Sequence, residues 1–168
     1  MRLSVLDQSP IAEGMRGGDA LRNSLELAAL ADSLGFHRFW MAEHHATPSL
    51  ASASPELMLS AIGRETRRIR IGTGGVMLPH YSPFKVAESF SMLAGLFPGR
   101  VDLGLGRAPG SDPLTAFALQ QDRRARAPPA AYHLLIFRSG CSKPWLVHLK
   151  QQYWVPAGVT ATACEVSA

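Results

Sequence analysis

Three short stretches of the sequence carry residues that suit chemistry, and each stands at the end of an apolar segment. Glu43, His44 and His45 occupy the first stretch. An imidazole titrates near neutral pH, so a histidine next to a carboxylate suits general acid–base work. Paired histidines also occur as metal ligands or as ordinary hydrogen-bonded loop residues. The residues alone leave these three interpretations open.

The other two stretches are rich in glycine. Residues 72–75 read GTGG and residues 104–107 read GLGR. Glycines in a strand mark either a bulge or a place where a ligand approaches the backbone closely. The second run resembles the start of a dinucleotide-binding fingerprint, but Pro109 stands where that motif requires a glycine. A Rossmann-type interpretation is therefore poor.

The elements that must position these residues alternate between strand and helix. Short apolar runs bounded by turn residues predict strands, and apolar residues at helical spacing after Asp or Ser-Pro start signals predict helices. Asp19 is the expected cap of the first helix. The expected strands are residues 2–7, 36–42, 69–77 and 100–105, and the expected helices are residues 19–34, 55–67 and 83–97. This order indicates an α/β fold with parallel strands joined by right-handed crossovers.

Two architectures fit this order, namely a doubly wound sheet and a (β/α)₈ barrel, and topology alone does not choose between them. Both place their functional sites at the carboxyl ends of the strands. The three stretches follow the second, third and fourth expected strands, so we expect them to meet at that edge of the sheet.

Composition restricts the class of protein. With 46% hydrophobic and 18% charged residues, the chain is too apolar for intrinsic disorder, and no apolar run approaches the length of about 20 residues needed to span a bilayer. The start of the sequence lacks a signal-like apolar run, so we expect a cytoplasmic protein that does not insert into membranes. Cys141 and Cys164 make neither a disulfide framework nor a metal knuckle, and we expect no metal site.

Four motifs together resemble one family. They are WMAEHH at 40–45, IRIGTGGVMLP at 69–79, SPFKVAE at 82–88 and GRVDLGLGRAPG at 99–110. In this order and spacing they are similar to the luciferase-like flavin monooxygenases. The resemblance covers residues 1–122 and implies a partial (β/α)₈ TIM barrel of about four βα units. It also implies an FMN-dependent monooxygenase, in which reduced FMN and O₂ oxidise a small organic substrate.

The resemblance also assigns roles to individual residues. It places His44 beside the flavin as the catalytic acid or base. It implies that Glu43, Gly74, Gly75 and Arg107 help to bind the cofactor, with the glycine pair at a position where the family often has a non-prolyl cis peptide. Arg107 matches a contact to the FMN phosphate, although a lone arginine is more often a surface ion-pair partner.

Residues 123–168 do not continue the pattern. They show no clear βα rhythm, and the whole excess of positive charge lies in residues 121–168, because residues 1–120 carry eleven basic and eleven acidic side chains. We interpret this segment as the product of a reading-frame shift near Arg123, or else as a divergent tail that covers the open edge of the half-barrel. Without such cover, the edges of the first and fourth strands stay unpaired.

The half-barrel leaves further alternatives. The chain is then a truncated monooxygenase, with or without activity as given, or a non-catalytic module that binds flavin or dimerises. Completion of the barrel by a second copy, or pairing through helices 55–67 and 83–97, predicts a homo-oligomer. The sequence leaves open whether a flavin reductase is a partner. Arg123, Arg124 and Arg126 suggest a nucleic-acid-binding extension, but the even charge of the preceding residues does not support it, and we expect no nucleic-acid partner.

Overall fold

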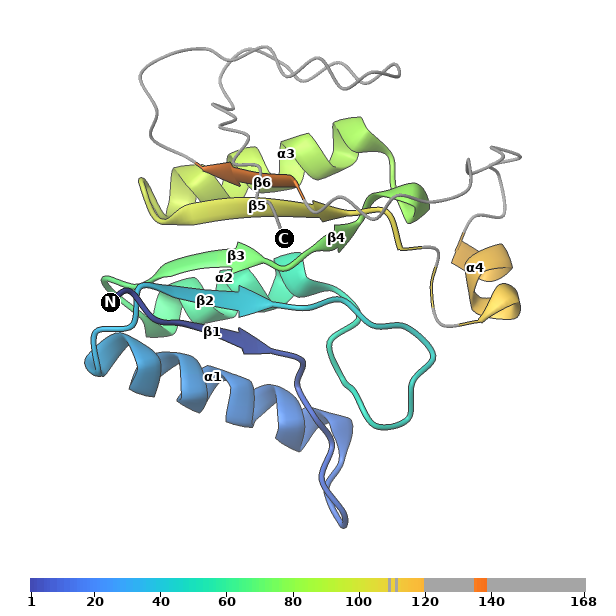
Figure 1. The fold of residues 1–168 in the computed structure, drawn as a ribbon, viewed down its shortest axis with the longest axis horizontal. Helices are drawn as coiled ribbons and strands as arrows, with labels where there is room; N and C mark the ends of the chain where they lie inside the picture. The colour runs from blue at the N-terminus through green and yellow to red at the C-terminus, as the bar shows by residue number, and fades with distance from the viewer. Residues whose placement is uncertain (109, 111, 120–134, 139–168) are drawn as a thin grey trace.

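The computed structural model describes residues 1–108, 110, 112–119 and 135–138. Strands and helices alternate along this part of the chain (Figure 1). The strands are β1 (Ser4–Asp7), β2 (Arg38–Met41), β3 (Arg70–Thr73), β4 (Val76–Met77), β5 (Val101–Gly106) and β6 (Leu135–Arg138). The helices are α1 (Gly17–Ser33), α2 (Pro55–Glu65), α3 (Pro83–Leu96) and α4 (Pro113–Leu119), with a short 3₁₀ turn at Leu78–His80.

The sheet favours the barrel over the doubly wound alternative. Strands β1, β2, β3 and β5 lie side by side in chain order and are parallel. A doubly wound sheet requires a point at which the strand order reverses, and these four strands show no such reversal. Helices α1, α2 and α3 contribute to one core cluster, so they pack on the same face of the sheet (Figure 1). The predicted α/β fold, a partial (β/α)₈ barrel, is confirmed.

The core lies between the helices and one face of the sheet. Alternate residues of each strand point to this face, as the two-residue period of a strand dictates. The fully buried side chains of this layer include Phe39, Met41, Leu59, Ile62 and Ile71. The opposite face corresponds to the interior of a barrel and presents Leu6, which remains 59% exposed.

The expected third strand is two strands. Gly74 and Gly75, joined by a cis peptide bond, separate β3 from β4, and both strands pair with β5. Ile71 is opposite Val101 and Val76 is opposite Leu105, so five steps on one side face four on the other. One extra residue is therefore inserted at the glycines, which is a β-bulge.

The start of α1 also differs from expectation. The helix begins at Gly17, and Asp19 acts from the third helical position by accepting a hydrogen bond from the Arg16 amide at 2.9 Å. Helices α2 and α3 begin as predicted, with Pro55 and Pro83 in the first turn. A proline fits there because that turn has no partner for its amide.

Two elements beyond β5 were not predicted as such. Helix α4 follows Asp112, whose Oδ1 accepts a hydrogen bond from the Thr115 amide at 2.9 Å. Strand β6 pairs antiparallel with β5. The edge of the fourth expected strand is therefore paired, which agrees with the alternative of a tail that covers this edge. The rest of residues 123–168 and the proposed nucleic-acid contacts at Arg123, Arg124 and Arg126 lie outside the described residues.

Within the described part of the chain, no helix has the length and apolar character needed to cross a bilayer.

Candidate functional site

The carboxyl ends of the parallel strands bring the sequence-predicted residues to one end of the sheet. Glu43 and His44 follow β2, the glycine pair follows β3, and Arg107 follows β5. The arrowheads of these strands point to the same end in Figure 1.

Glu43 is the centre of the site. Its side chain is fully buried, and both carboxylate oxygens accept hydrogen bonds. Oε2 accepts the Met77 amide at 2.8 Å, and Oε1 accepts the Tyr81 hydroxyl at 2.6 Å. Oε1 also lies 2.7 Å from Nε2 of His45. The carboxylate thus ties the end of β2 to β4 and to the residue just before α3.

This arrangement gives Glu43 a structural role, since its two oxygens have three partners in the chain. The cofactor contact that the resemblance implies stays a prediction. We infer that Glu43 supports the site by fixing the position of the Met77 backbone and of the His45 imidazole. A buried carboxylate is tolerable here because hydrogen bonds replace its hydration.

His44 lies beside this network and is partly buried. Its backbone amide donates to the carbonyl oxygen of Ser52 at 2.8 Å, and the Ser52 hydroxyl donates to the Ala42 carbonyl at 2.6 Å. These bonds hold the loop after β2. The Nδ1 atom of His44 is buried and has no hydrogen-bond partner among the described residues. A buried imidazole nitrogen of this kind is available to a ligand atom.

Gly74, which follows β3, lies against the side chains of Leu6 and Trp40. A methyl group at Gly74 would lie 3.2 Å from Cδ1 of Leu6 and 3.4 Å from Cβ of Trp40. Gly74 thus faces the barrel-interior side of the sheet, together with two apolar side chains. The cis bond to Gly75 agrees with what the resemblance implied.

Arg107 is exposed just beyond β5. The structure places it at the same end of the sheet as Glu43 and His44. Whether it meets a phosphate stays a prediction.

The structure adds four residues to which sequence reasoning assigned no role, namely His45, Glu56, His80 and Tyr81. Glu56 and Tyr81 line a small cavity of about 60 Å³ together with residues of α3. The rings of His45 and His80 meet edge to face, with their centroids 6.1 Å apart. Tyr81 directly precedes the Ser82-Pro83 start signal of α3. Its place between the end of a strand and the start of a helix is the sequence signal that could have found it.

Burial and the Glu43 charge perturb two of these groups. Burial, followed by the hydrogen bond to Glu43, raises the pKa of Tyr81 far above its ordinary value. Burial and then repulsion by Glu43 raise the pKa of Glu56, although the Glu56 amide and His45 act against this. Both groups are therefore biased toward their neutral forms.

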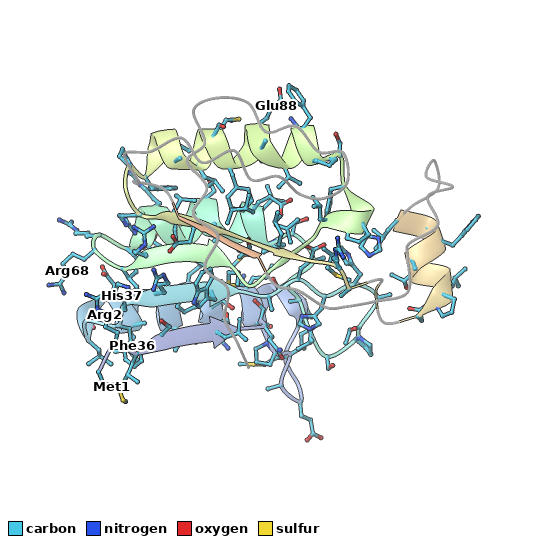
Figure 2. All side chains as sticks on the ribbon, turned by 45° about the horizontal axis from the view of Figure 1, so that its top comes forward. Met1, Arg2, Phe36, His37, Arg68 and Glu88 are labelled. Carbon is cyan, nitrogen blue, oxygen red and sulfur yellow. The ribbon has the colours of Figure 1, made fainter. Side chains whose placement is uncertain are left out.

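A larger cavity, of about 430 Å³, lies at the opposite end of the strands. Figure 2 labels several of its lining residues, which gather at the amino-terminal side of the sheet. They include Met1, Arg2, Phe36, His37 and Arg68. In barrels this end serves stability, so the cavity is separate from the candidate site.

No group of three or more histidine, cysteine, aspartate or glutamate side chains in the described ranges has the arrangement of a metal site.

Comparison with known proteins identifies the family. The model of the family described as "Luciferase-like monooxygenase" matches residues 1–135. The uncharacterized protein YwcH of Bacillus subtilis is 54% identical over 125 residues, covering 74% of this chain and 38% of that protein. The N-acetyl-S-alkylcysteine monooxygenase of the same organism is 50% identical over 122 residues, a match that covers 73% of this chain and 36% of that protein.

Solved structures agree with this result. The crystal structure of apo-MsnO8 superposes with a TM-score of 0.72 at 47% identity, covering 75% of this chain and 38% of that one. The oxygenating constituent of 3,6-diketocamphane monooxygenase from Pseudomonas putida, solved in complex with FMN, has a TM-score of 0.65 at 24% identity and supports the fold alone. It covers 71% of this chain and 32% of that one.

The chain spans 38% and 36% of the lengths of the two curated relatives. Within that span, the matched family, the chain-order parallel sheet and the cis glycine pair at the strand ends agree with one another. This chain belongs to the luciferase-like monooxygenase family.

Proposed function

We propose that the chain supplies the amino-terminal part of an FMN site in a monooxygenase that uses O₂ to oxidise a small organic substrate. The carrying observation is the strand-end arrangement around Glu43, which holds the Met77 backbone and His45 while Nδ1 of His44 stays buried without a partner. Family membership supports the reaction class, and one relative of the same fold was solved with FMN.

The residues present fit such a cofactor. Leu6 and Trp40 lie on the barrel-interior face in contact with the Gly74 position, and Gly74 adds no side chain of its own there. A bare backbone flanked by apolar groups suits a flat aromatic ring. The exposed guanidinium of Arg107 suits a phosphate, to which it can donate two parallel hydrogen bonds.

The protein groups then have distinct tasks. Reduced FMN, when bound, supplies the electrons for O₂ activation. His44 holds or accepts a proton at Nδ1, the nitrogen that lacks a partner in the chain. Glu43 fixes the loop after β2 relative to the Met77 backbone, so that His44 stays at the position proposed for contact with the flavin ring.

Titration of the 168-residue chain with FMN, followed by flavin fluorescence, tests this proposal. We expect saturable quenching, weakened by Arg107→Gln. Arg64→Gln, at an exposed position of α2, is the matched control and leaves the affinity unchanged. Absence of quenching at high micromolar protein contradicts flavin binding by this chain.

A second candidate is a flavin-binding module without oxygenase activity. It rests on the same strand-end residues, since contacts of a flavin ring with Gly74, Leu6 and Trp40 require no oxygenase reaction. Supplying reduced FMN and O₂ with an aliphatic aldehyde or thioether distinguishes the two functions. Oxidised substrate supports the monooxygenase, whereas tight FMN binding without product supports the module.

We also infer a homo-oligomer that pairs through α2 and α3. Four large apolar side chains on these helices are more than half exposed, namely Leu57, Phe84, Met92 and Leu96. Burying such side chains against a second copy is favourable by about 25 cal/mol per Å² of apolar surface.

A further inference from the structure

A line of polar groups leads from the cavity between α2 and α3 to the strand-end site. Glu56, in the first turn of α2, and Tyr81, just before α3, both line the cavity. The Tyr81 hydroxyl donates to Oε1 of Glu43 at 2.6 Å. The same oxygen lies 2.7 Å from Nε2 of His45. Each step between Tyr81 and His45 is thus a single short hydrogen bond.

The cavity completes the line on its outer side. Its volume of about 60 Å³ exceeds the share of one water molecule in the liquid, roughly 30 Å³. It has polar groups for water to contact, from Glu56, Tyr81 and Ser89. Lys85, which also lines it, has a side chain that is 73% exposed, so the cavity extends toward solvent.

We propose that Glu56, Tyr81 and Glu43 form a proton relay that connects solvent at α3 with the His45 imidazole at the strand-end site. The path itself consists of groups of this chain. Only the reaction that would consume or release the proton rests on the proposed function. It assigns a proton-conducting role to Tyr81 and Glu56, and His45 is its inner terminus.

The proton movement balances along this path. Glu56, directly or through a water molecule in the cavity, gives a proton to the Tyr81 oxygen while the Tyr81 hydroxyl gives its own proton to Oε1 of Glu43. When the neutral His45 ring carries its own proton on Nδ1, Glu43 passes the proton received from Tyr81 to the unprotonated Nε2, and the ring becomes an imidazolium whose Nε2–H donates to Oε1. Breaking and forming O–H bonds in step leaves Tyr81 neutral throughout, and the reverse sequence carries a proton outward.

The charges around the path are consistent with this transfer. Burial and Glu43 hold the pKa of Tyr81 well above its ordinary value, so the phenol remains a donor. Burial and Glu43 also raise the pKa of Glu56, which favours the protonated acid as the outer donor. Lys85 of α3 faces the same cavity, and His80 lies against His45 on the inner side.

Proton exchange at His45 in the full 168-residue chain without flavin tests the relay. The ring Nε2–H of His45 is followed by ¹H–¹⁵N NMR, assigned by its loss in His45→Asn, and its exchange with water is measured by saturation transfer. We expect Tyr81→Phe and Glu56→Gln each to slow this exchange by about a hundredfold, the lower end of what a positioned proton-transfer group contributes. Glu65→Gln, the same change at an exposed position of α2 that does not line the cavity, is the control and leaves the rate unchanged.

The Met77 amide reports separately on structure, because it donates to the other oxygen of Glu43. Unchanged exchange in Tyr81→Phe with an unshifted Met77 amide overturns the relay. If the Met77 amide shifts in Tyr81→Phe, Glu56→Gln decides, since Glu56 makes no hydrogen bond to Glu43 among those of the described residues. Slower exchange in that variant supports the relay, and an unchanged rate overturns it. None of these outcomes depends on FMN binding, so they are independent of the proposed function.

Discussion

Trp40 of β2 packs directly on Gly72, its partner in the register of β3. A Cβ atom at Gly72 would lie 2.5 Å from Cζ3 of Trp40 and 2.8 Å from the carbonyl oxygen of Asp102. Real Cβ atoms essentially never approach another heavy atom this closely, and one of the two neighbours belongs to the backbone of β5. The indole therefore occupies the space that any side chain at position 72 requires.

Gly72→Ala should destabilise the fold, by about 1–3 kcal/mol as is typical of overpacking. Urea unfolding followed by tryptophan fluorescence measures the loss. Gly95→Ala in α3 is the control, because its added methyl group meets nothing within 4 Å. Alanine is favoured over glycine in a helix by roughly 0.5–1 kcal/mol, so this variant should gain stability. Equal stability of Gly72→Ala and the wild type contradicts the packing described here.

Asp102 should be essential for stability, because it is 1% exposed and bridges two arginines. Arg38 donates from Nε to Oδ2 at 2.9 Å, and Arg70 donates from Nε to Oδ2 at 2.8 Å. Asp102→Asn leaves both guanidinium groups partly buried without their counter-charge, which costs about 3–5 kcal/mol for a buried pair. Thermal and urea unfolding provide the measurement.

Glu88→Gln is the contrasting variant for this ion pair. Glu88 projects from the outer side of α3 (Figure 2) and lies 3.5 Å from Lys85, with both side chains at least 48% exposed. An exposed pair of this kind contributes about 0–1 kcal/mol. A similar loss in Asp102→Asn and Glu88→Gln is the result that would rule out a special role for Asp102.

Asp32 should make the stability depend on pH. Burial raises the pKa of Asp32, but hydrogen bonds from the amides of Arg67, Ile69 and Arg68 outweigh it, so the pKa lies below its ordinary 3.8. The folded state thus favours the carboxylate, and its stabilisation is present above pH 3.8 and is lost as the pH falls through the folded-state pKa.

Asp32→Asn should accordingly lower the free energy of unfolding by about 2–3 kcal/mol at pH 7, since hydrogen bonds to a charged group contribute about 1.5–3 kcal/mol. The difference from the wild type should shrink as the pH falls below 4, about the ordinary carboxyl pKa. Urea unfolding at a series of pH values measures it, with Glu26→Gln on the exposed side of α1 as control. A difference that stays constant with pH is incompatible with this assignment.

Much of the fold was predictable because local signals and periodicity agree. Pro55 and Pro83 stand where helices begin, and the alternation along β2 buries Phe39 and Met41 on one face. The division of the third strand was not predictable from alternation, because the bulge at Gly74 and Gly75 is defined only by pairing with β5. The antiparallel strand β6 likewise depends on long-range pairing.

The candidate site shows the same division. The positions of Glu43 and His44 after β2 follow from the end of a strand. The partners of Glu43 do not, because Met77 and Tyr81 are 34 and 38 residues away in the sequence. Contacts of this kind arise only when parallel crossovers bring strand ends together. Sequence reasoning thus locates the edge where a site forms, while the folded chain selects the groups that support it.

The apolar side chains on α2 and α3 should control self-association. We expect the wild type to be dimeric, and Leu57→Lys and Met92→Lys, each at a position about 70% exposed, to shift it toward the monomer. A lysine placed in an apolar interface loses its hydration without gaining a partner. Leu114→Lys on α4 is the matched control, because that leucine is 76% exposed but lies outside the proposed interface. Sedimentation velocity over a concentration series distinguishes the variants. A monomeric wild type, or equal dissociation of all three variants, excludes pairing through α2 and α3.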